Sequence, residues 1–111
     1  MKNKKVLKPW GWEEWFAHTS KYVGKLIFIR KGHRLSKQYH RFKQETVLAN
    51  QGCWVLEHNG KKIKMKPGIA ITIQPKEIHR FTAPIEDVLL IEVSTPQVHD
   101  VVRLEDDYGR R

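Results

Sequence analysis

Cysteine is almost absent from this chain of 111 residues: the single one, Cys53, excludes an intrachain disulfide. No apolar run approaches the ~20 residues of a membrane-spanning helix, and the basic N-terminus lacks the apolar segment of a secretory signal. These absences make a cytoplasmic location the expectation. The sequence also lacks an internal repeat, a low-complexity tract and a linker, so we expect one domain over residues 1–111.

Acidic residues are scarce beside basic ones, 12 Asp and Glu against 21 Lys and Arg, which gives a net charge of +9. Such an excess indicates an anionic partner. Nucleic acid is disfavoured as that partner, because no nucleic-acid-binding motif accompanies the charge. Part of the excess falls on an N-terminal segment that we expect to be loose, with its lysines at Lys2, Lys4, Lys5 and Lys8.

A sustained helical period is missing too, and the chain consists instead of short β-like runs separated by turn residues. The predicted strands cover 25–30, 36–41, 45–50, 53–58, 61–66, 69–74, 79–83 and 88–94. Repeated short strands of this kind predict an all-β sandwich or barrel. The N-terminal arm, about residues 1–24, is expected to pack on the barrel through its tryptophans, with a short helical turn near residues 12–16.

An Asn-Gly pair at positions 59 and 60 predicts a hairpin, because both residues tolerate the positive φ angles of a type I′ turn. That turn pairs Leu56 with Ile63 and Trp54 with Met65, and alternation places these four side chains on one buried face. The opposite, solvated face carries the remaining residues, Glu57, Lys62, Lys64 and Lys66.

Four polar residues are placed to meet inside such a barrel. Gln38 and His40 lie two apart in a predicted strand and share a side, Glu45 follows on the next strand, and His79 begins a later one. Burying these groups without partners is unfavourable. One reading is a divalent metal held by their imidazole, amide and carboxylate donors, which suit Zn, Mn, Fe, Co or Ni. The other is that they are ordinary surface or hydrogen-bonded residues.

The stretch GHRLSKQYHRFKQETVLANQG (32–52) resembles the first cupin motif, G-x5-H-x-H-x4-E-x6-G, with Gln38 at the first His position. That replacement, preceded by Arg-Leu-Ser, is similar to type II mannose-6-phosphate isomerase cupins. Residues 67–81 resemble the second cupin motif, although its spacing differs and Glu77 stands near the usual Gly. Residues 8–16 and 100–110 resemble the opening and the closing stretches of the same isomerase-like family.

This resemblance implies an all-β cupin, a double-stranded β-helix or jelly-roll barrel. It also implies one divalent transition metal, Zn foremost, on Gln38, His40, Glu45 and His79. The implied activity is aldose–ketose isomerisation of a sugar phosphate such as mannose 6-phosphate. Arg103 is then the expected cation for the phosphate or an enediolate oxygen, or else a structural partner of the acids at 105–107. Glu45, a metal-bound hydroxide and Glu14 are the candidate bases.

Two further expectations follow. The residues around Glu45 differ from the isomerase pattern, since Arg41, Phe42 and Thr46 replace family residues. The alternative function is therefore a non-catalytic or differently catalytic metal-binding cupin that binds a sugar or another small anion.

Exposed strand edges need a cover, and small cupins are often dimers, so we expect a homodimer.

Overall fold

The structure is a computed structural model that describes residues 3–111, and over this range it contains strands and no helix. The strands are β1 (Lys4–Lys8), β2 (Gly11–His18), β3 (Val23–Ile29), β4 (His33–Arg34), β5 (Lys37–His40), β6 (Glu45–Gln51), β7 (Trp54–His58), β8 (Lys61–Met65), β9 (Ala70–Ile73), β10 (His79–Ala83), β11 (Val88–Ser94) and β12 (Val101–Glu105). The all-β prediction is confirmed. Over residues 3–111 no helix is long and apolar enough to cross a membrane.

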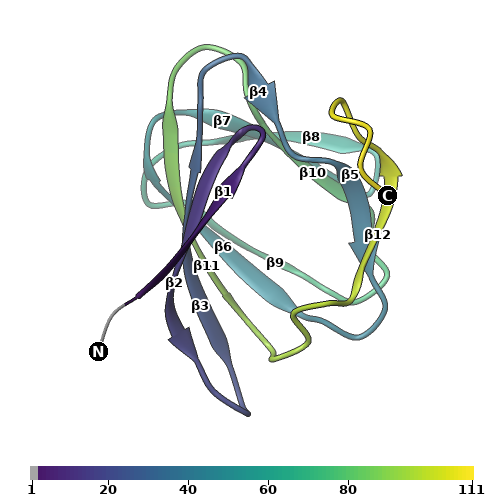
Figure 1. Ribbon diagram of the computed structural model, residues 1–111. Helices are drawn as coiled ribbons and strands as arrows, with labels where there is room; N and C mark the ends of the chain where they lie inside the picture. Colours follow the sequence, from purple (N-terminus) through teal and green to yellow (C-terminus); the bar gives the residue numbers. More distant parts are fainter. Residues whose placement is uncertain (1–2) are drawn as a thin grey trace.

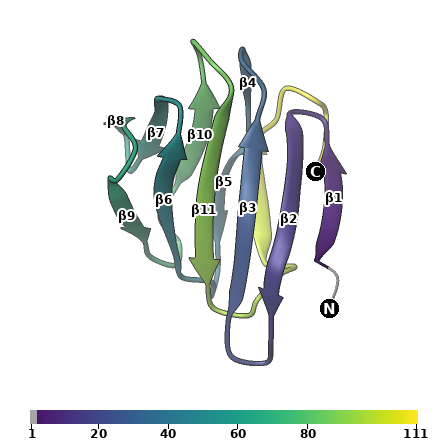
Figure 2. The ribbon, with the colours of Figure 1, turned by 90° about the vertical axis from the view of Figure 1, so that its left-hand side faces the viewer.

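Two antiparallel sheets enclose the interior (Figure 1). Sheet A has the order β1-β2-β3-β11-β6-β9, and sheet B has the order β12-β5-β10-β7-β8 with β4 paired to β10. Figure 2 shows sheet A in front and the strands of sheet B behind it. Strands far apart in the sequence are thereby neighbours, which is how β6 and β10 bring their first residues to one place.

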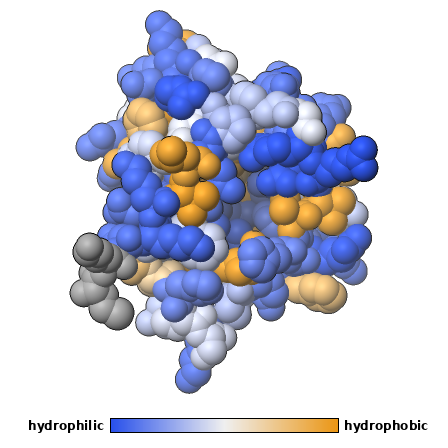
Figure 3. Space-filling view, in the orientation of Figure 1, coloured by the Kyte–Doolittle hydropathy of each residue, from blue (hydrophilic) through white to orange (hydrophobic). Residues whose placement is uncertain are grey.

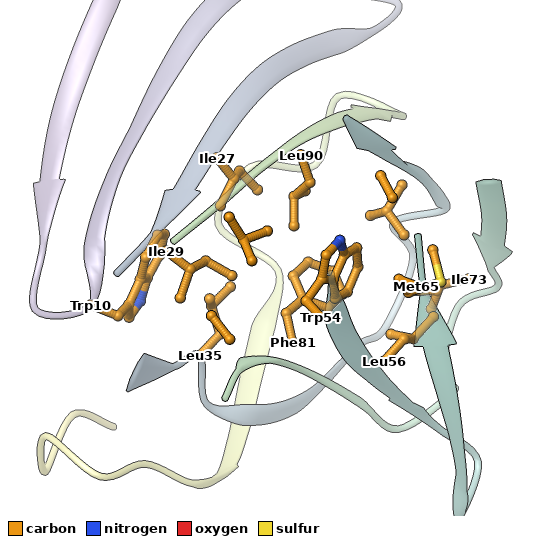
Figure 4. Packing of buried hydrophobic residues seen from close by; sticks show 14 residues of the cluster. Trp10, Ile27, Ile29, Leu35, Trp54, Leu56, Met65, Ile73, Phe81 and Leu90 are labelled. Atoms are coloured by element: carbon orange, nitrogen blue, oxygen red, sulfur yellow. The ribbon is translucent and has the colours of Figure 1, made fainter. Parts of the chain in front are cut away.

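The core lies between the sheets and is built by the two-residue alternation of each strand. In β3, Ile27 and Ile29 point inward and are buried, whereas Leu26 and Phe28, which alternate with them, face outward and are half-buried. Trp54 and Phe81 meet edge to face at the centre, with ring centroids 5.2 Å apart (Figure 4). The apolar cluster extends from Trp10 at one side to Met65 and Ile73 at the other.

The predicted hairpin is confirmed with its register. Leu56 pairs with Ile63 and Trp54 with Met65 across β7 and β8, and Asn59 adopts a positive φ of 51°. Trp54, Leu56 and Met65 are buried, and Ile63 is half-buried against the same core. The lysines at 62, 64 and 66 are exposed, as the amphipathic pattern requires.

The N-terminal segment differs from the prediction. Residues 4–8 are strand β1, paired with β2, rather than a loose arm, and the expected helical turn at residues 12–16 is wrong because β2 runs through it. Pairing with β3 decides the conformation: Trp12 stacks on Phe28 at 5.4 Å, and a Cβ at Gly11 would lie 2.0 Å from the Phe28 carbonyl oxygen. Lys2, also assigned to that arm, lies outside the described residues. Strand β12 was not predicted.

The hairpin gives a direct test of core burial. Leu56 is 0% exposed, so Leu56→Ala should lower the free energy of unfolding by about 2–5 kcal/mol. Lys64 is exposed on the partner strand, and Lys64→Ala should change it by no more than about 0.5 kcal/mol. Urea unfolding of both variants measures the difference, and similar losses would contradict the assigned faces.

Candidate metal centre

Three side chains from separate strands converge inside the barrel. His40 ends β5, Glu45 begins β6 after a short turn, and His79 begins β10. His79 Nε2 lies 3.1 Å from Glu45 Oε1, and His40 Nδ1 lies 3.5 Å from the same oxygen. Their donor atoms all lie within 4.8 Å of one another. The three residues could therefore hold a metal ion.

The state of the buried donor atoms fits a metal. Glu45 is 2% exposed and His79 is 1% exposed. Both carboxylate oxygens of Glu45 and Nε2 of His79 are buried without a hydrogen-bond partner among the described residues. Buried polar atoms are nearly always paired, and an unpaired carboxylate is especially unfavourable. A divalent cation coordinated by these atoms would remove that penalty.

The turn between β9 and β10 positions both histidines. The Glu77 carbonyl oxygen lies 3.0 Å from His79 Nδ1 and accepts a hydrogen bond from it, which leaves Nε2 facing Glu45. The Lys76 backbone N–H donates to the His40 carbonyl at 2.6 Å. Lys76 reaches this position with a φ of 71°, in the left-handed region that favours glycine. Outer hydrogen bonds of this kind fix the tautomer and ring orientation of metal-binding histidines.

Glu77 holds that turn together. Its side chain accepts hydrogen bonds from the Gln74 backbone N–H at 2.7 Å and from the Asn59 amide at 2.6 Å, and it lies 3.0 Å from His58 Nε2. The Gln74 hydrogen bond, followed by the contact with His58, lowers the pKa of Glu77 to about 2. Glu77 stands near the position of the usual glycine in the second cupin motif. At this position its three side-chain contacts fix the conformation of the turn.

Gln38, the fourth predicted ligand, lies beside the centre. It shares the inward face of β5 with His40 and lies opposite His79 in the pairing of β5 and β10. Opposed residues of paired strands have Cβ atoms about 5 Å apart. The Ser36 hydroxyl donates to Gln38 Oε1 at 3.2 Å, which orients the amide.

A buried ion pair adjoins Glu45. Lys43 Nζ lies 3.2 Å from Glu92 Oε2, and both side chains are buried. Burial, reinforced by the Glu92 carboxylate, raises the pKa of Glu45 to about 7. Burial, with a contribution from Lys43, lowers the pKa of His40 to about 3, which keeps this imidazole neutral. For His79, burial acts to lower the pKa, but Glu45 and the Glu77 carbonyl together raise it.

A cavity of about 450 Å³ reaches Gln38 and His40 from the open end of the barrel. In Figure 3 this end is a hollow bordered by hydrophilic and some apolar side chains. The cationic side chains that line the cavity are Lys4, Lys8, Lys25, Lys43, Arg103 and Arg110. Only Glu13 and Glu92 bring carboxylates to its lining, and both lie near lysines. The cavity therefore carries a surplus of positive charge.

Arg103, the predicted anion-binding residue, lies at the cavity. Arg103 lines the cavity, its Nη1 donates to the Arg111 carbonyl at 2.7 Å, and its Nε is buried without a partner among residues 3–111. The acids expected as alternative partners pair elsewhere: Glu105 with Arg80, Asp106 with Arg110 and Asp107 with Arg34.

Glu14 is not brought to the site. Strand alternation turns it to the outer face of sheet A, where Asn3 donates to its carboxylate at 3.1 Å. The neighbouring Glu13 takes the inward position, is buried, and lies 3.5 Å from Lys25. Glu14 therefore lies outside the cavity because of its position in β2.

Sequence reasoning missed three charged residues on the inward face of sheet A, Glu13, Lys25 and Glu92, and also Lys43 in the turn before β6. A signal for one of them was present. Glu92 interrupts the apolar run of residues 88–94 at a position in phase with the buried Val88 and Leu90. A charge at an inward position of a buried strand indicates a polar site.

Two facing antiparallel sheets around a buried His–Glu–His cluster define a cupin. The mannose-6-phosphate isomerase C-terminal family model matches residues 1–106, and the chain belongs to this family. No match was found among curated proteins.

Solved structures agree on the fold. KdgF from Halomonas sp. is 20% identical, with a TM-score of 0.79 and 89% of each chain covered. An RmlC-like cupin from Shewanella frigidimarina is 15% identical, with a TM-score of 0.80 over 88% of this chain and 87% of its own. The capsular polysaccharide assembling protein CapF from Staphylococcus aureus is 17% identical, with a TM-score of 0.79, and the match spans 94% of this chain but 34% of CapF.

The ligand set predicts a metal content that can be measured. Protein purified without a metal column should contain close to one transition-metal ion per chain, and His40→Ala/His79→Ala should remove it because two of three buried donors are lost. The variant His18→Ala, which alters an exposed imidazole outside the cavity, is the control and should keep the metal. Elemental analysis measures the metal content of both variants. Metal retained at wild-type level after loss of His40 and His79 would contradict the site.

The turn predicts an effect at a distance from the ligands. Glu77→Ala removes the acceptor for Gln74 and Asn59, so metal affinity should fall by about 10–100-fold as the histidines lose their support. Glu57→Ala, on the outer face of β7, is the control and should leave affinity unchanged. Chelator competition measures both dissociation constants, and equal values for Glu77→Ala and wild type would show that the turn does not position the ligands.

Proposed function

We propose that the protein is a metal-dependent isomerase that interconverts the aldose and ketose forms of a phosphorylated sugar, with mannose 6-phosphate as the first candidate. The observation that carries this proposal is the cavity with surplus cations that leads to the buried His–Glu–His cluster. A sugar phosphate matches both features, because it brings a dianion and adjacent hydroxyl and carbonyl oxygens. Membership of the isomerase C-terminal family supports the assignment.

The cofactor in this proposal is one divalent transition metal, with Zn²⁺ first and Mn, Fe, Co or Ni as alternatives that suit the same donors. Gln38, His40, Glu45 and His79 would hold it. When bound, such a metal supplies Lewis-acid stabilisation of negative charge on the sugar oxygens. His40 is held neutral by its lowered pKa, and His79 would lose a proton from Nε2 when the metal binds, while the Glu77 carbonyl keeps its Nδ1 proton in place.

Arg103 is the proposed anion contact. Its guanidinium lines the cavity, and the acids of its own closing segment are engaged by other arginines. Two parallel N–H donors suit a phosphate or a developing enediolate oxygen better than a lysine does. Arg103 would thus fix one end of the sugar while the buried cluster lies at the other.

Glu45 is the proposed base. Isomerisation moves a proton from C2 to C1 and the O2 hydroxyl proton to O1, so a group near both carbons must carry protons. Glu14 faces away from the cavity, and Glu13 and Glu92 lie near Lys25 and Lys43. Among the described carboxylates at the site, Glu45 alone has both oxygens unpartnered, so that one oxygen can serve as a ligand and the other can carry the proton.

A cupin that binds a sugar or small anion without converting it is the alternative. It is supported by the burial of Glu45, which does not itself line the cavity, and by the exposed Arg41 and Phe42 where family members carry other residues. In both proposals the partner is a small molecule rather than nucleic acid, and a cytoplasmic location stays a prediction.

Turnover separates the two functions. Metal-loaded protein should convert mannose 6-phosphate to fructose 6-phosphate, and Arg103→Lys should lower kcat/KM at least about tenfold because the planar fork is lost. Metal content should stay constant. Arg41→Lys, an exposed arginine outside the cavity, is the matched control and should keep full activity.

Each negative result has its own meaning. A folded, metal-loaded protein without turnover on any hexose phosphate contradicts the isomerase. If mannose 6-phosphate then still raises the thermal midpoint through binding, the binding cupin is the better description. Equal activity of the Arg103→Lys and Arg41→Lys variants would remove Arg103 from the proposed site.

A further inference from the structure

Lysines occupy inward positions on the strands at one edge of sheet A. Lys8 of β1 and Lys25 of β3 line the cavity, and Lys4 of β1 lines it with them. Inward positions of a sheet that packs on a core are ordinarily apolar, and a lysine is seldom buried without a partner. Lys25 is nevertheless only 7% exposed. Three ammonium groups on one wall of the cavity therefore need a reason.

One buried carboxylate holds two of these lysines. Glu13 Oε1 lies 3.5 Å from Lys25 Nζ and 4.0 Å from Lys8 Nζ. The same oxygen accepts a hydrogen bond from Trp15 Nε1 at 2.9 Å. A single negative charge is thus shared between two positive charges, and the lysine pair keeps a net positive charge toward the cavity.

The indole of Trp15 fixes the lysines on either side of it. Lys4 on β1 and Lys25 on β3 are its cross-strand neighbours. Their Nζ atoms lie 5.0 and 4.4 Å from the ring centroid, within the range of a cation–π contact. Lysine side chains are flexible, and ordering them in advance lowers the entropy lost when they bind an anion.

Two arginines on the opposite wall approach the lysine pair. Figure 1 shows β1 and β12, the edge strands of the two sheets, on either side of the open interior, and the cavity is lined from both. Burial is the main cause that lowers the pKa of Lys8, and the Glu13 carboxylate acts against it. The charges of Arg103 and Arg110 add to the lowering, so both guanidinium groups lie within electrostatic range of Lys8.

Two N–H groups of residues that line this cavity have no acceptor. Arg103 Nε and Trp10 Nε1 are buried without a hydrogen-bond partner among residues 3–111. Buried donors are nearly always paired. Ammonium, guanidinium and indole groups donate and do not accept, so the ligand that matches this wall accepts hydrogen bonds from several directions. A phosphate dianion does so.

We propose that Lys8 and Lys25 form the second wall of a phosphate subsite, opposite Arg103, and that this subsite selects phosphorylated sugars over neutral ones. The inference rests on the proposed sugar-phosphate ligand and adds the residues that recognise its phosphate on sheet A. Glu13 and Trp15 act on the ligand only through the lysines that they position.

The strand spacing agrees with the reach of a hexose phosphate. Glu92 on β11 lies opposite Lys25, and β6, which begins at Glu45, is the next strand of the sheet. Two strand spacings, about 10 Å, therefore separate β6 from β3. Seven bonds connect C1 of a hexose 6-phosphate to its phosphorus, an extended length of about 8 Å. A sugar whose oxygens reach the buried His–Glu–His cluster can thus bring its phosphate to Lys25.

Lys8→Gln tests the subsite, because it removes one charge at a half-buried position of an edge strand. Calorimetric titration of metal-loaded wild type should show mannose 6-phosphate binding at least about tenfold tighter than mannose. Lys8→Gln should lose about tenfold in affinity for mannose 6-phosphate and keep its affinity for mannose. Lys5→Gln removes the same charge from the outward, exposed position of the same strand and should bind both ligands as wild type does.

Lys8→Arg keeps the charge and should bind mannose 6-phosphate nearly as wild type does. A loss as large as that of Lys8→Gln would overturn the role of this charge. Wild type that binds mannose 6-phosphate no tighter than mannose, or equal losses in Lys8→Gln and Lys5→Gln, would overturn the subsite. Inorganic phosphate bound as tightly as mannose 6-phosphate would overturn the selection of sugars.

These measurements separate the subsite from the isomerase. Protein that binds mannose 6-phosphate through Lys8 without converting it would contradict the isomerase and support the subsite. Turnover of mannose 6-phosphate with the same KM in Lys8→Gln and wild type would support the isomerase and contradict the subsite.

Discussion

The burial of the Glu45 carboxylate between two imidazoles is the constraint on which the rest of this structure depends. An ionisable group with both oxygens unpartnered in a barrel interior is strongly unfavourable by itself. The interior of the barrel has an apolar end and a charged end. Apolar side chains such as Ile29 and Leu56 fill one end, whereas the inward positions of sheet A at the other end carry Glu13, Lys25 and Glu92.

The turn before β10 shows how a short segment can orient a site that is made by distant strands. Its backbone contacts both histidines, through the Lys76 N–H and the Glu77 carbonyl. The Glu77 side chain in turn ties the segment to the hairpin at Asn59. The same Asn-Gly turn that sets the register of β7 and β8 therefore also supports His79. Ligand geometry and hairpin geometry are coupled through one carboxylate.

The excess of positive charge is distributed over surfaces with separate roles. Lysines 62 and 64 form the solvated side of a hairpin, while Lys43 and Arg103 line the cavity. The net charge of the composition thus indicates an anionic partner, but only the placement of each cation shows where an anion can bind.

The sequence by itself determined the features that depend on local chemistry. The period of two, the Asn-Gly turn and its flanking residues were sufficient for the strand class and the hairpin register, because turn geometry and alternation act over a few residues. The spacing of Gln38, His40 and Glu45 likewise depends on one strand and one turn. His79 is 34 residues from Glu45 in sequence, and the resemblance to the second cupin motif supported its place in the ligand set.

Only the tertiary structure decided what depends on contacts between distant strands. The segment at 12–16 became β2 because Phe28 and the Gly11 approach select an extended backbone. The same pairing turned Glu14 outward and Glu13 into the cavity. Arg103 was separated from the acids beside it in sequence because Arg34, Arg80 and Arg110 engage them from elsewhere. These outcomes are set by long-range pairing, whose partners no local pattern specifies.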